Sequence, residues 1–379
     1  DDFLKINKML SKVNYSYEKH RTLKSISPKH VLFINIRLYA YLTCGRYKKK
    51  TRMDGKTVIV TGCTSGIGKE TAKELAKRGA RVIMACRNVD AANKIKGEND
   101  FGILAVIVKK LDLSSFESIR SFAADINKTE AKLDVLIHNA GYAETFRKNK
   151  SIDGIELTMA TNHYGPFLLT HLLVDLLKKS VPSRIVIVAS SLYRLASFDL
   201  SNPNPLTSLP GYLYYASKEA NILFTKELAR RLEGTGITAN CLHPGLIDSG
   251  IWRSVPAPLS WGLALINKLF FKTPFEGAQT SIMLAVDESL DKVNGKYFSD
   301  CQESSVSSSA SNMDRAKKLW EISENMCNTH VILSRLFTFV FVLTINIDQL
   351  KSPRENAPLP AKTNTNKTKC ILMLFFYSI

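Results

Sequence analysis

Residues 57–68 read TVIVTGCTSGIG, a run of β-type residues that leads directly into a glycine-rich turn and then a helix-like stretch. Glycine lets the backbone turn tightly and approach a pyrophosphate, while the helix N-terminus offers N–H groups to the anion. Such a turn is weak evidence alone, but at the start of a βαβ unit it predicts dinucleotide binding rather than a chance loop. We expect cofactor contacts from Gly62, Ser65, Gly66, Ile67 and Gly68.

Outward from this turn, Val- and Ile-rich runs alternate with amphipathic segments as far as about Tyr297. The predicted strands are 57–61, 81–86, 103–108, 133–137, 184–190, 237–242 and 296–298. The predicted helices are 69–78, 88–97, 114–128, 152–180, 213–232, 275–286 and 312–327, with loops over 198–212 and 246–274. Runs that are apolar on both sides, joined by helices, predict a buried parallel sheet. We therefore predict one α/β domain over 54–327, a doubly wound Rossmann sheet of about seven strands with helices on both faces.

The net charge of +18 is concentrated outside this domain. Residues 1–56 carry a net +10 and residues 328–379 a net +4, so the middle of the chain is nearly balanced. No basic patch with interleaved aromatic residues occurs in the domain, so nucleic-acid binding is not expected. The flank 1–53 is typical of a solvated tail, with a membrane-surface or targeting element as the alternative. The tail 328–379 starts with an apolar run and continues as a polar segment of the kind that stays disordered.

Two further patterns bound the cellular setting. The apolar runs 31–44 and 331–347 fall at or below the roughly 20 residues that cross a bilayer, so each is a candidate for a weak anchor only. The seven cysteines are scattered without CxxC spacing, which argues against a zinc site and against a disulfide framework. A reducing, intracellular environment fits best.

The end of the second predicted strand bears on cofactor choice. Sites that prefer NAD usually place an acidic residue there, whereas this chain has Arg87. A guanidinium at that point can clamp a ribose 2′-phosphate, which favours NADP(H); stacking on the adenine or facing solvent are the alternatives for Arg87. Asp112, after the third strand, is a candidate partner for the adenine amino group, with helix capping as its alternative, and Leu113 next to it is a further expected contact.

Tyr214 and Lys218 lie four residues apart in YYASK, at the start of a predicted helix over 217–232. That spacing places both side chains on one helix face. A phenol exchanges protons poorly at neutral pH, and an adjacent ammonium is expected to lower its pKa. The pair is common on ordinary helices, so it needs support from elsewhere. The neighbouring Tyr215 has no lysine at the same spacing.

That support comes from polar residues that follow the other strands. Ligands of open parallel sheets bind at the carboxyl ends of the strands, and the polar residues converge on that edge. A serine there can donate to a substrate carbonyl. The candidates are Asn139, Ala140 and Gly141 after the fourth strand, Asn162 in the next helix, Ser190 and Ser191 after the fifth strand, and Pro244 and Gly245 after the sixth.

Taken in order, TGxxxGxG, NAG, Asn, Ser, YxxxK and PG resemble the short-chain dehydrogenase/reductase family over about 54–327. Stretches such as GIGKETAKELA, ILFTKELARRLEGTGITANCLHPG and GKYFSDC are similar to its retinol dehydrogenase-like group. The resemblance implies a catalytic tetrad. Tyr214 exchanges the proton and Lys218 lowers its pKa and binds the nicotinamide ribose. Ser191 orients the carbonyl, and Asn162 holds a proton-relay water. It also implies NADP(H) and a cofactor contact from Ser249.

The implied activity is interconversion of an alcohol and a carbonyl on an apolar substrate such as retinal or another lipid aldehyde, covered by the aromatic segment 246–274. The alternative is a non-catalytic NADP(H)-binding sensor or scaffold. The group also implies association with a membrane surface, facing the cytosol at the endoplasmic reticulum or, as a lesser alternative, at mitochondria, and a homo-oligomer. Departures from the family pattern include Cys63 in the glycine turn, His138 before NAG, and Pro166. His138, His163 and His243 are expected to be packing or supporting groups rather than catalysts.

Overall fold

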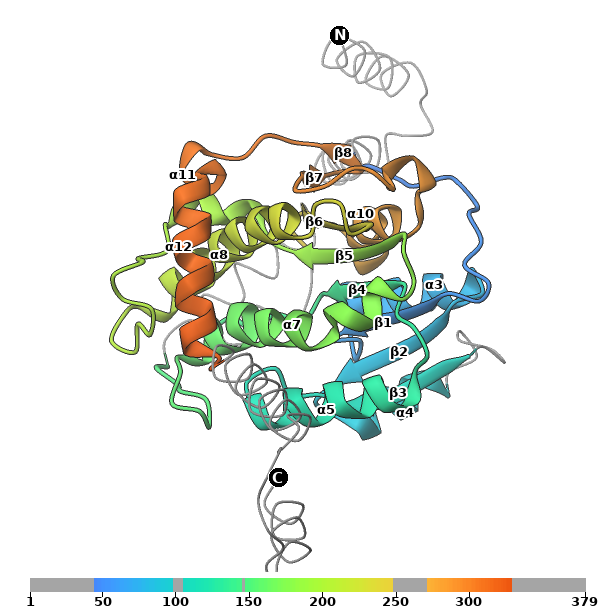
Figure 1. Cartoon of the computed structure of the whole chain (residues 1–379), viewed down its shortest axis with the longest axis horizontal. Coiled ribbons are helices and arrows are strands. Elements are labelled where there is room, and N and C mark those ends of the chain that lie inside the picture. Colours follow the sequence, from blue (N-terminus) through green and yellow to red (C-terminus); the bar gives the residue numbers. More distant parts are fainter. Residues whose placement is uncertain (1–43, 98–104, 145–146, 248–270, 329–379) are drawn as a thin grey trace, which may run out of the picture. The chain divides into compact units, whose positions relative to one another are not determined.

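The computed structural model describes residues 44–97, 105–144, 147–247 and 271–328. Within them, one sheet has the strand order β3-β2-β1-β4-β5-β6-β7-β8 (Figure 1). Strands β1 to β7 pair in parallel, and β8 returns antiparallel to β7. The bounds are β1 Thr57–Thr61, β2 Arg81–Cys86, β3 Val106–Lys110, β4 Val135–His138, β5 Ser183–Val188, β6 Ile237–His243, β7 Tyr297–Ser299 and β8 Gln302–Glu303. The predicted doubly wound sheet is confirmed.

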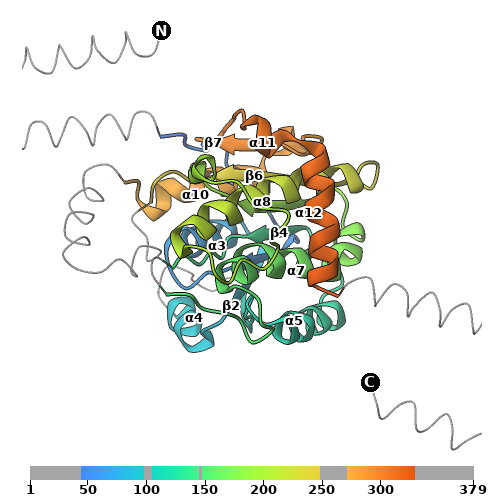
Figure 2. The same cartoon turned by 90° about the vertical axis from the view of Figure 1, so that its left-hand side faces the viewer.

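Helices cover both faces of the sheet (Figures 1 and 2). One face carries α3 (Gly66–Lys77), α4 (Val89–Lys96) and α10 (Pro274–Val286). The other carries α5 (Phe116–Thr129), α7 (Gly165–Lys178) and α8 (Pro210–Arg231), with α12 (Met313–Met326) packed on α8.

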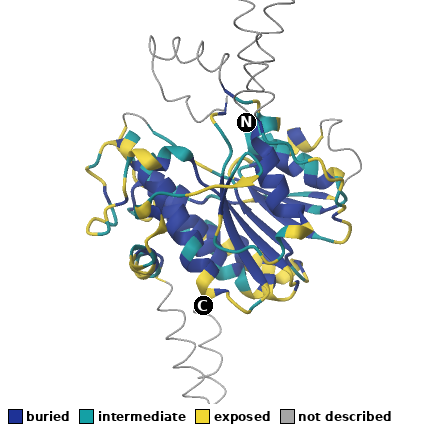
Figure 3. Cartoon of the chain, turned by 90° about the horizontal axis from the view of Figure 1, so that it is seen from above, coloured by how far each residue is buried: buried dark blue, intermediate teal, exposed yellow. Residues whose placement is uncertain are grey.

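Because side chains alternate along a strand, β1 feeds both hydrophobic cores. Val58 and Val60 pack with α3 and α10, whereas Ile59 packs with α5 and α7. The whole of β1 is buried, as are most of the central strands (Figure 3).

Several boundaries differ from the prediction. The expected helix 152–180 is a short α6 (Leu157–Met159), a π-helix η2 (Ala160–Tyr164) and α7. The expected helix 213–232 begins earlier, at Pro210, because proline is favoured in the first turn of a helix. The fifth strand ends at Val188, and a short 3-10 helix, η3 (Ser191–Leu195), follows.

Strand β8 was not expected at all. The turn that precedes it holds Asp300 and Cys301 at φ values of 51° and 60°, which non-glycine residues rarely adopt. A sequence pattern without glycine at this point does not predict a tight hairpin. The short helices η5 (Glu288–Leu290) and α11 (Ser308–Ser311) complete the described elements.

The basic flank is packed onto the domain from at least Cys44 onward. The Tyr47 amide donates to Gln279 Oε1 at 3.3 Å, and Lys49 pairs with Asp287 at 2.8 Å. Arg78 donates to the backbone oxygen of Thr51 at 3.0 Å. This segment therefore belongs to the domain, although its predicted boundary was residue 54.

Several predictions lie outside the described residues: the flank up to residue 43, most of the aromatic segment 246–274, Ser249, both candidate anchors apart from Cys44, and the tail after residue 328. Among the residues that are described, no helix has both the length and the apolar character needed to cross a bilayer.

Candidate active site

A cavity of about 770 Å³ opens at the carboxyl edge of the sheet. It collects residues from the ends of six strands, which the topology brings to one edge. Those residues include Thr61 after β1, Arg87 after β2, Asp112 and Leu113 after β3, Asn139, Ala140 and Gly141 after β4, Ser190 after β5, and Pro244 and Gly245 after β6. Tyr214 and Lys218 of α8 line the same cavity. The predicted convergence of the motifs is therefore present.

The glycine turn is shaped by close backbone contacts. Gly62 has φ +70°, and a Cβ there would lie 2.8 Å from Ala140 Cα. A Cβ on Gly68 would lie 2.3 Å from both Asn139 Nδ2 and the Gly62 oxygen. Ser65, the N-cap of α3, makes no side-chain cap hydrogen bond, so the first turn keeps N–H groups for a ligand. The turn thus has the shape and the N–H groups to hold a pyrophosphate. Gly66 and Ile67, at the start of α3, also line the cavity.

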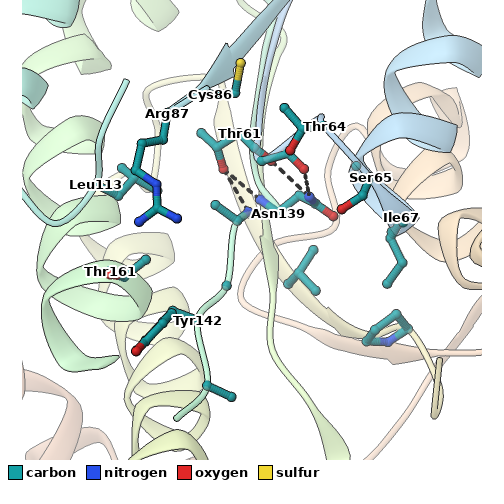
Figure 4. A pocket seen from close by; sticks show the side chains of 18 of the residues that line it. Thr61, Thr64, Ser65, Ile67, Cys86, Arg87, Leu113, Asn139, Tyr142 and Thr161 are labelled. Atoms are coloured by element: carbon teal, nitrogen blue, oxygen red, sulfur yellow. Dashed lines mark hydrogen bonds between the residues drawn. The ribbon is translucent and has the colours of Figure 1, made fainter. Parts of the chain in front are cut away.

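Thr61 and Asn139 tie this turn to the end of β4 (Figure 4). Thr61 Oγ1 accepts from the Asn139 and Ala140 amides, each at 3.0 Å. Asn139 Nδ2 donates to the backbone oxygens of Thr61 at 2.9 Å and Gly62 at 3.2 Å. Asn139 therefore holds the glycine turn in shape as well as lining the pocket. Sequence reasoning missed the role of Thr61, because a threonine at a strand end has no distinctive pattern.

The part of the cavity next to the end of β2 carries Arg87, whose side chain lies near Leu113 and Thr161 (Figure 4). It is exposed, and no described residue pairs with its guanidinium. An anion can therefore approach it without displacing a partner. Asp112 also lines the cavity, yet its Oδ1 already accepts from the Ser114 amide at 2.9 Å and hydroxyl at 2.6 Å. Asp112 thus stabilises the turn between β3 and α5. The N-cap of α5 is Ser115, so Asp112 does not fill the helix-capping role that was its alternative.

Tyr214 and Lys218 share one face of α8, as their spacing predicts. Lys218 Nζ lies 5.5 Å from the centroid of the Tyr214 ring and donates to the Val188 backbone oxygen at 2.9 Å. Burial raises the pKa of Tyr214 to about 12, against a smaller opposing effect of a hydrogen bond from Ser190. Burial lowers the pKa of Lys218 to about 8.

The expected lowering of the Tyr214 pKa by Lys218 is therefore not found. Both groups are buried, and removal from water disfavours the charged form of each. The ammonium is also directed at a backbone carbonyl rather than at the phenol oxygen. Tyr214 stays protonated at neutral pH, which suits a proton donor.

Of the two serines after β5, Ser190 lines the cavity together with Tyr214, whereas the resemblance implies a role for Ser191. Ser190 is 5% exposed and lines the cavity, and its side chain opposes the rise in the pKa of Tyr214. It is also the N-cap of η3, accepting from the Leu192 amide at 3.2 Å. Ser191 is already the first residue of that helix and does not line the cavity. The structure therefore brings Ser190, rather than Ser191, to the wall of the cavity.

Asn162 lies in the π-helix η2, a rare form that often marks functional sites. Its Oδ1 accepts from the Tyr142 amide at 2.7 Å. Its Nδ2 donates to the Tyr142 oxygen at 2.8 Å and to Ser217 Oγ at 3.0 Å. Both N–H groups of the Asn162 side chain therefore have partners within the protein. Through them, Asn162 connects the loop after Gly141 to α8, the helix that carries Lys218. Sequence reasoning also missed Tyr142, which lines the cavity, because it belongs to no recognisable motif (Figure 4).

His138 is buried beneath this edge, with Nε2 2.7 Å from Thr170 Oγ1. Thr170 Oγ1 itself donates to the Pro166 oxygen at 2.8 Å, so the imidazole must donate from Nε2. Burial lowers the pKa of His138 to about 3. A neutral, fully enclosed imidazole of this kind is a packing group.

Comparison with known proteins supplies the remaining evidence. The chain matches the short chain dehydrogenase family over residues 56–259. It is 45% identical to Retinol dehydrogenase 14 of Mus musculus over 292 residues, 72% of this chain and 86% of that one. It is also 45% identical to Retinol dehydrogenase 11 of Homo sapiens over 285 residues, 74% and 89% of the two chains. Among solved structures, an uncharacterized protein from Mycobacterium paratuberculosis shares the fold, with a TM-score of 0.60 at 29% identity over 73% of this chain and 95% of its own.

Proposed function

Because the chain belongs to the short-chain dehydrogenase family, we propose that it is an NADP(H)-dependent oxidoreductase that interconverts an alcohol and a carbonyl on an apolar substrate. One observation carries the proposal. Tyr214, Lys218 and Ser190 line the same cavity as the glycine turn Gly62–Gly68. A proton-exchanging group therefore lies where a bound nicotinamide and a carbonyl would meet.

The residues of the cavity fit a dinucleotide. The glycine turn and the N-terminus of α3 would hold the pyrophosphate, and Arg87 would pair with a 2′-phosphate. Asp112, Leu113, Asn139, Ala140 and Gly141 would surround the adenosine half, and Pro244 and Gly245 the nicotinamide half; Ser249 remains a proposed contact there. When bound, the reduced nicotinamide supplies the hydride.

The protein's own groups handle the oxygen and the proton. In the reducing direction, Ser190 Oγ donates a hydrogen bond to the carbonyl oxygen and stabilises the charge that develops there. Tyr214, protonated at neutral pH, transfers its proton to that oxygen, so the carbonyl becomes an alcohol. The positive charge of Lys218, present below about pH 8, lies 5.5 Å from the centroid of the Tyr214 ring and would offset part of the cost of burying the phenolate that remains. Asn162 holds the loop beside the site through Tyr142.

The lining favours a lipid-like substrate. Leu157, Leu192, Leu246 and Ile247 contribute apolar side chains to the cavity. Two relatives that are 45% identical to this chain are named retinol dehydrogenases, which points to retinal or another lipid aldehyde as the substrate. We further propose association with the cytosolic surface of the endoplasmic reticulum membrane and assembly into a homo-oligomer, as the resemblance implies.

A substrate screen tests this function directly. The full chain is assayed for NADPH and NADH oxidation with all-trans-retinal, medium-chain aldehydes and a sugar aldehyde, alongside Tyr214→Phe. We expect NADPH-dependent turnover of the apolar aldehydes and a loss of at least about a hundredfold in the variant. An equal rate in Tyr214→Phe, or tight NADPH binding without turnover of any carbonyl, would favour the sensor or scaffold instead.

A further inference from the structure

Helix α12 lies beyond the family match, which ends at residue 259, yet it packs against α8, the helix of Tyr214 and Lys218 (Figures 1 and 2). Its buried face includes Leu319, Trp320 and Ser323. Ser323 is 0% exposed, so its hydroxyl is enclosed by protein. A buried hydroxyl needs partners, and those of Ser323 identify what the helix supports.

Ser323 takes part in two hydrogen bonds, one within α12 and one that connects α12 to the π-helix η2. Its Oγ donates to the Leu319 backbone oxygen at 2.7 Å. A hydroxyl has one proton, so the contact of 2.8 Å between Ser323 Oγ and His163 Nε2 requires the imidazole to donate. His163 is therefore held in one tautomer, with its ring oriented by α12.

The surroundings leave this imidazole little freedom. His163 is 0% exposed and packs edge-on against Phe224 of α8, with ring centroids 6.0 Å apart. Trp320 of α12 packs against the same aromatic cluster, with its ring centroid 4.9 Å from that of Phe167. Burial lowers the pKa of His163 to about 3, so it stays neutral and keeps a single pattern of donor and acceptor.

His163 directly follows Asn162 in η2, where the backbone already departs from α-helical geometry. A π-helical turn has poorer intrinsic stability than an α-helical one, so its shape depends on its neighbours. On one side of η2, the side-chain amide of Asn162 forms hydrogen bonds with Tyr142 and Ser217. On the other side of η2, the His163 imidazole donates a hydrogen bond to Ser323 of α12.

We propose that Ser323 is a positioning residue that acts through His163 to hold Asn162 in its working orientation. The proposal rests on the proposed function, because it assigns Asn162 to the active site. It makes the C-terminal helix part of the catalytic apparatus rather than an appendage to the fold.

The test compares two serines of the C-terminal helices. Ser311 Oγ, like Ser323 Oγ, donates to a backbone oxygen of its own helix, that of Ser308 at 3.0 Å, but Ser311 is exposed to solvent. We expect Ser323→Ala to lower kcat about tenfold, with the KM for NADPH unchanged, because small displacements of active-site groups carry large rate costs. Ser311→Ala should keep the wild-type kcat, and Ser323→Thr, which retains the hydroxyl, should recover most of the loss.

A double-mutant cycle separates positioning from general loss of stability. In an Asn162→Ala background, Ser323→Ala should change kcat by less than about twofold, because the group it positions is gone. An unchanged kcat in Ser323→Ala alone, or the same tenfold drop in both backgrounds, would overturn the proposal. Thermal unfolding of each variant shows whether the protein stays folded at the assay temperature. Should the wild-type chain reduce no carbonyl, the proposed function itself fails, a result distinct from these.

Discussion

Ser190 and Tyr214 line the same cavity, although Ser190 follows β5 and Tyr214 lies in the second turn of α8. The cavity thus brings together a hydrogen-bond donor for a carbonyl and a protonated phenol, from segments that a long loop separates along the chain. Of the two adjacent serines, Ser190 is the one that lines this cavity, and it is therefore the one we propose for the site.

The first prediction concerns those serines. Ser190→Ala should lower kcat about 10²- to 10³-fold, because it removes a donor that stabilises developing charge on the substrate oxygen. Ser191→Ala, the matched control, should stay within about threefold of wild type, because Ser191 does not line the cavity. Steady-state kinetics with an apolar aldehyde measure both. The reverse order of effects would return the role to Ser191.

Reduction should depend on the charge of Lys218. Its pKa is lowered from 10.5 to about 8, so the ammonium is present below that pH and is lost above it. We expect kcat/KM for aldehyde reduction to fall as the pH rises through about 8. Lys218→Arg retains its charge across this range and should remove the fall, even if its rate is lower. A wild-type profile that stays level to about pH 10 would contradict the assignment.

Cofactor preference should depend on Arg87. Replacing it in Arg87→Leu removes a charge-assisted contact to a 2′-phosphate, which is expected to raise the Kd for NADPH roughly 10- to 100-fold. The Kd for NADH should hardly change, since NADH lacks that phosphate. Arg52→Leu is the control, because Arg52 pairs with Asp54 on the surface at 2.6 Å. Equal losses for both cofactors would mean that Arg87 contacts the adenine instead.

The glycine turn should tolerate no side chain at Gly68. In Gly68→Ala the new methyl would meet Asn139 Nδ2 and the Gly62 oxygen at 2.3 Å. We expect a destabilisation of about 1–3 kcal/mol and weak NADPH binding, because the turn must open to relieve the clash. Gly211→Ala in α8 is the control, since nothing lies within 4 Å of a Cβ there. Thermal unfolding and NADPH titration would show the contrast, and matching values for the two variants would refute it.

Folding stability should fall in mild acid because of His138. Its pKa is about 3 in the folded protein, against an ordinary value of 6.5, so the unfolded chain binds the extra proton between these values. The stabilising contribution is therefore complete above about pH 6.5 and is lost as the pH falls towards 3. Lowering the pH from about 7.5 to about 5.5 should cost about 1.4 kcal/mol through this residue.

Urea unfolding of wild type and His138→Asn at both pH values measures that loss. The variant has no imidazole to protonate at this position. Between the two pH values its free energy of unfolding should therefore fall by about 1.4 kcal/mol less than that of wild type. His163 contributes a similar loss in both proteins, so the variant does not become independent of pH. An identical pH dependence in the two proteins would show that His138 has the same pKa in the folded and the unfolded chain.

The sequence by itself determined the sheet and its cofactor turn. Val- and Ile-rich runs such as Thr57–Thr61 specify buried strands by their composition, and the glycines of the turn specify a backbone that no other residue fits. The Tyr214–Lys218 face follows equally from local geometry, because a spacing of four residues has the same meaning on any helix. These features depend on neighbours along the chain.

Only the tertiary structure brought Ser190 rather than Ser191 to the cavity, raised the pKa of Tyr214 where a lowering was expected, and placed Ser323 beside His163. Each of these depends on which distant side chains enclose a group and how far they exclude water from it. Burial and orientation arise from packing between elements that are far apart in the chain, and the periodicity of a sequence does not encode them.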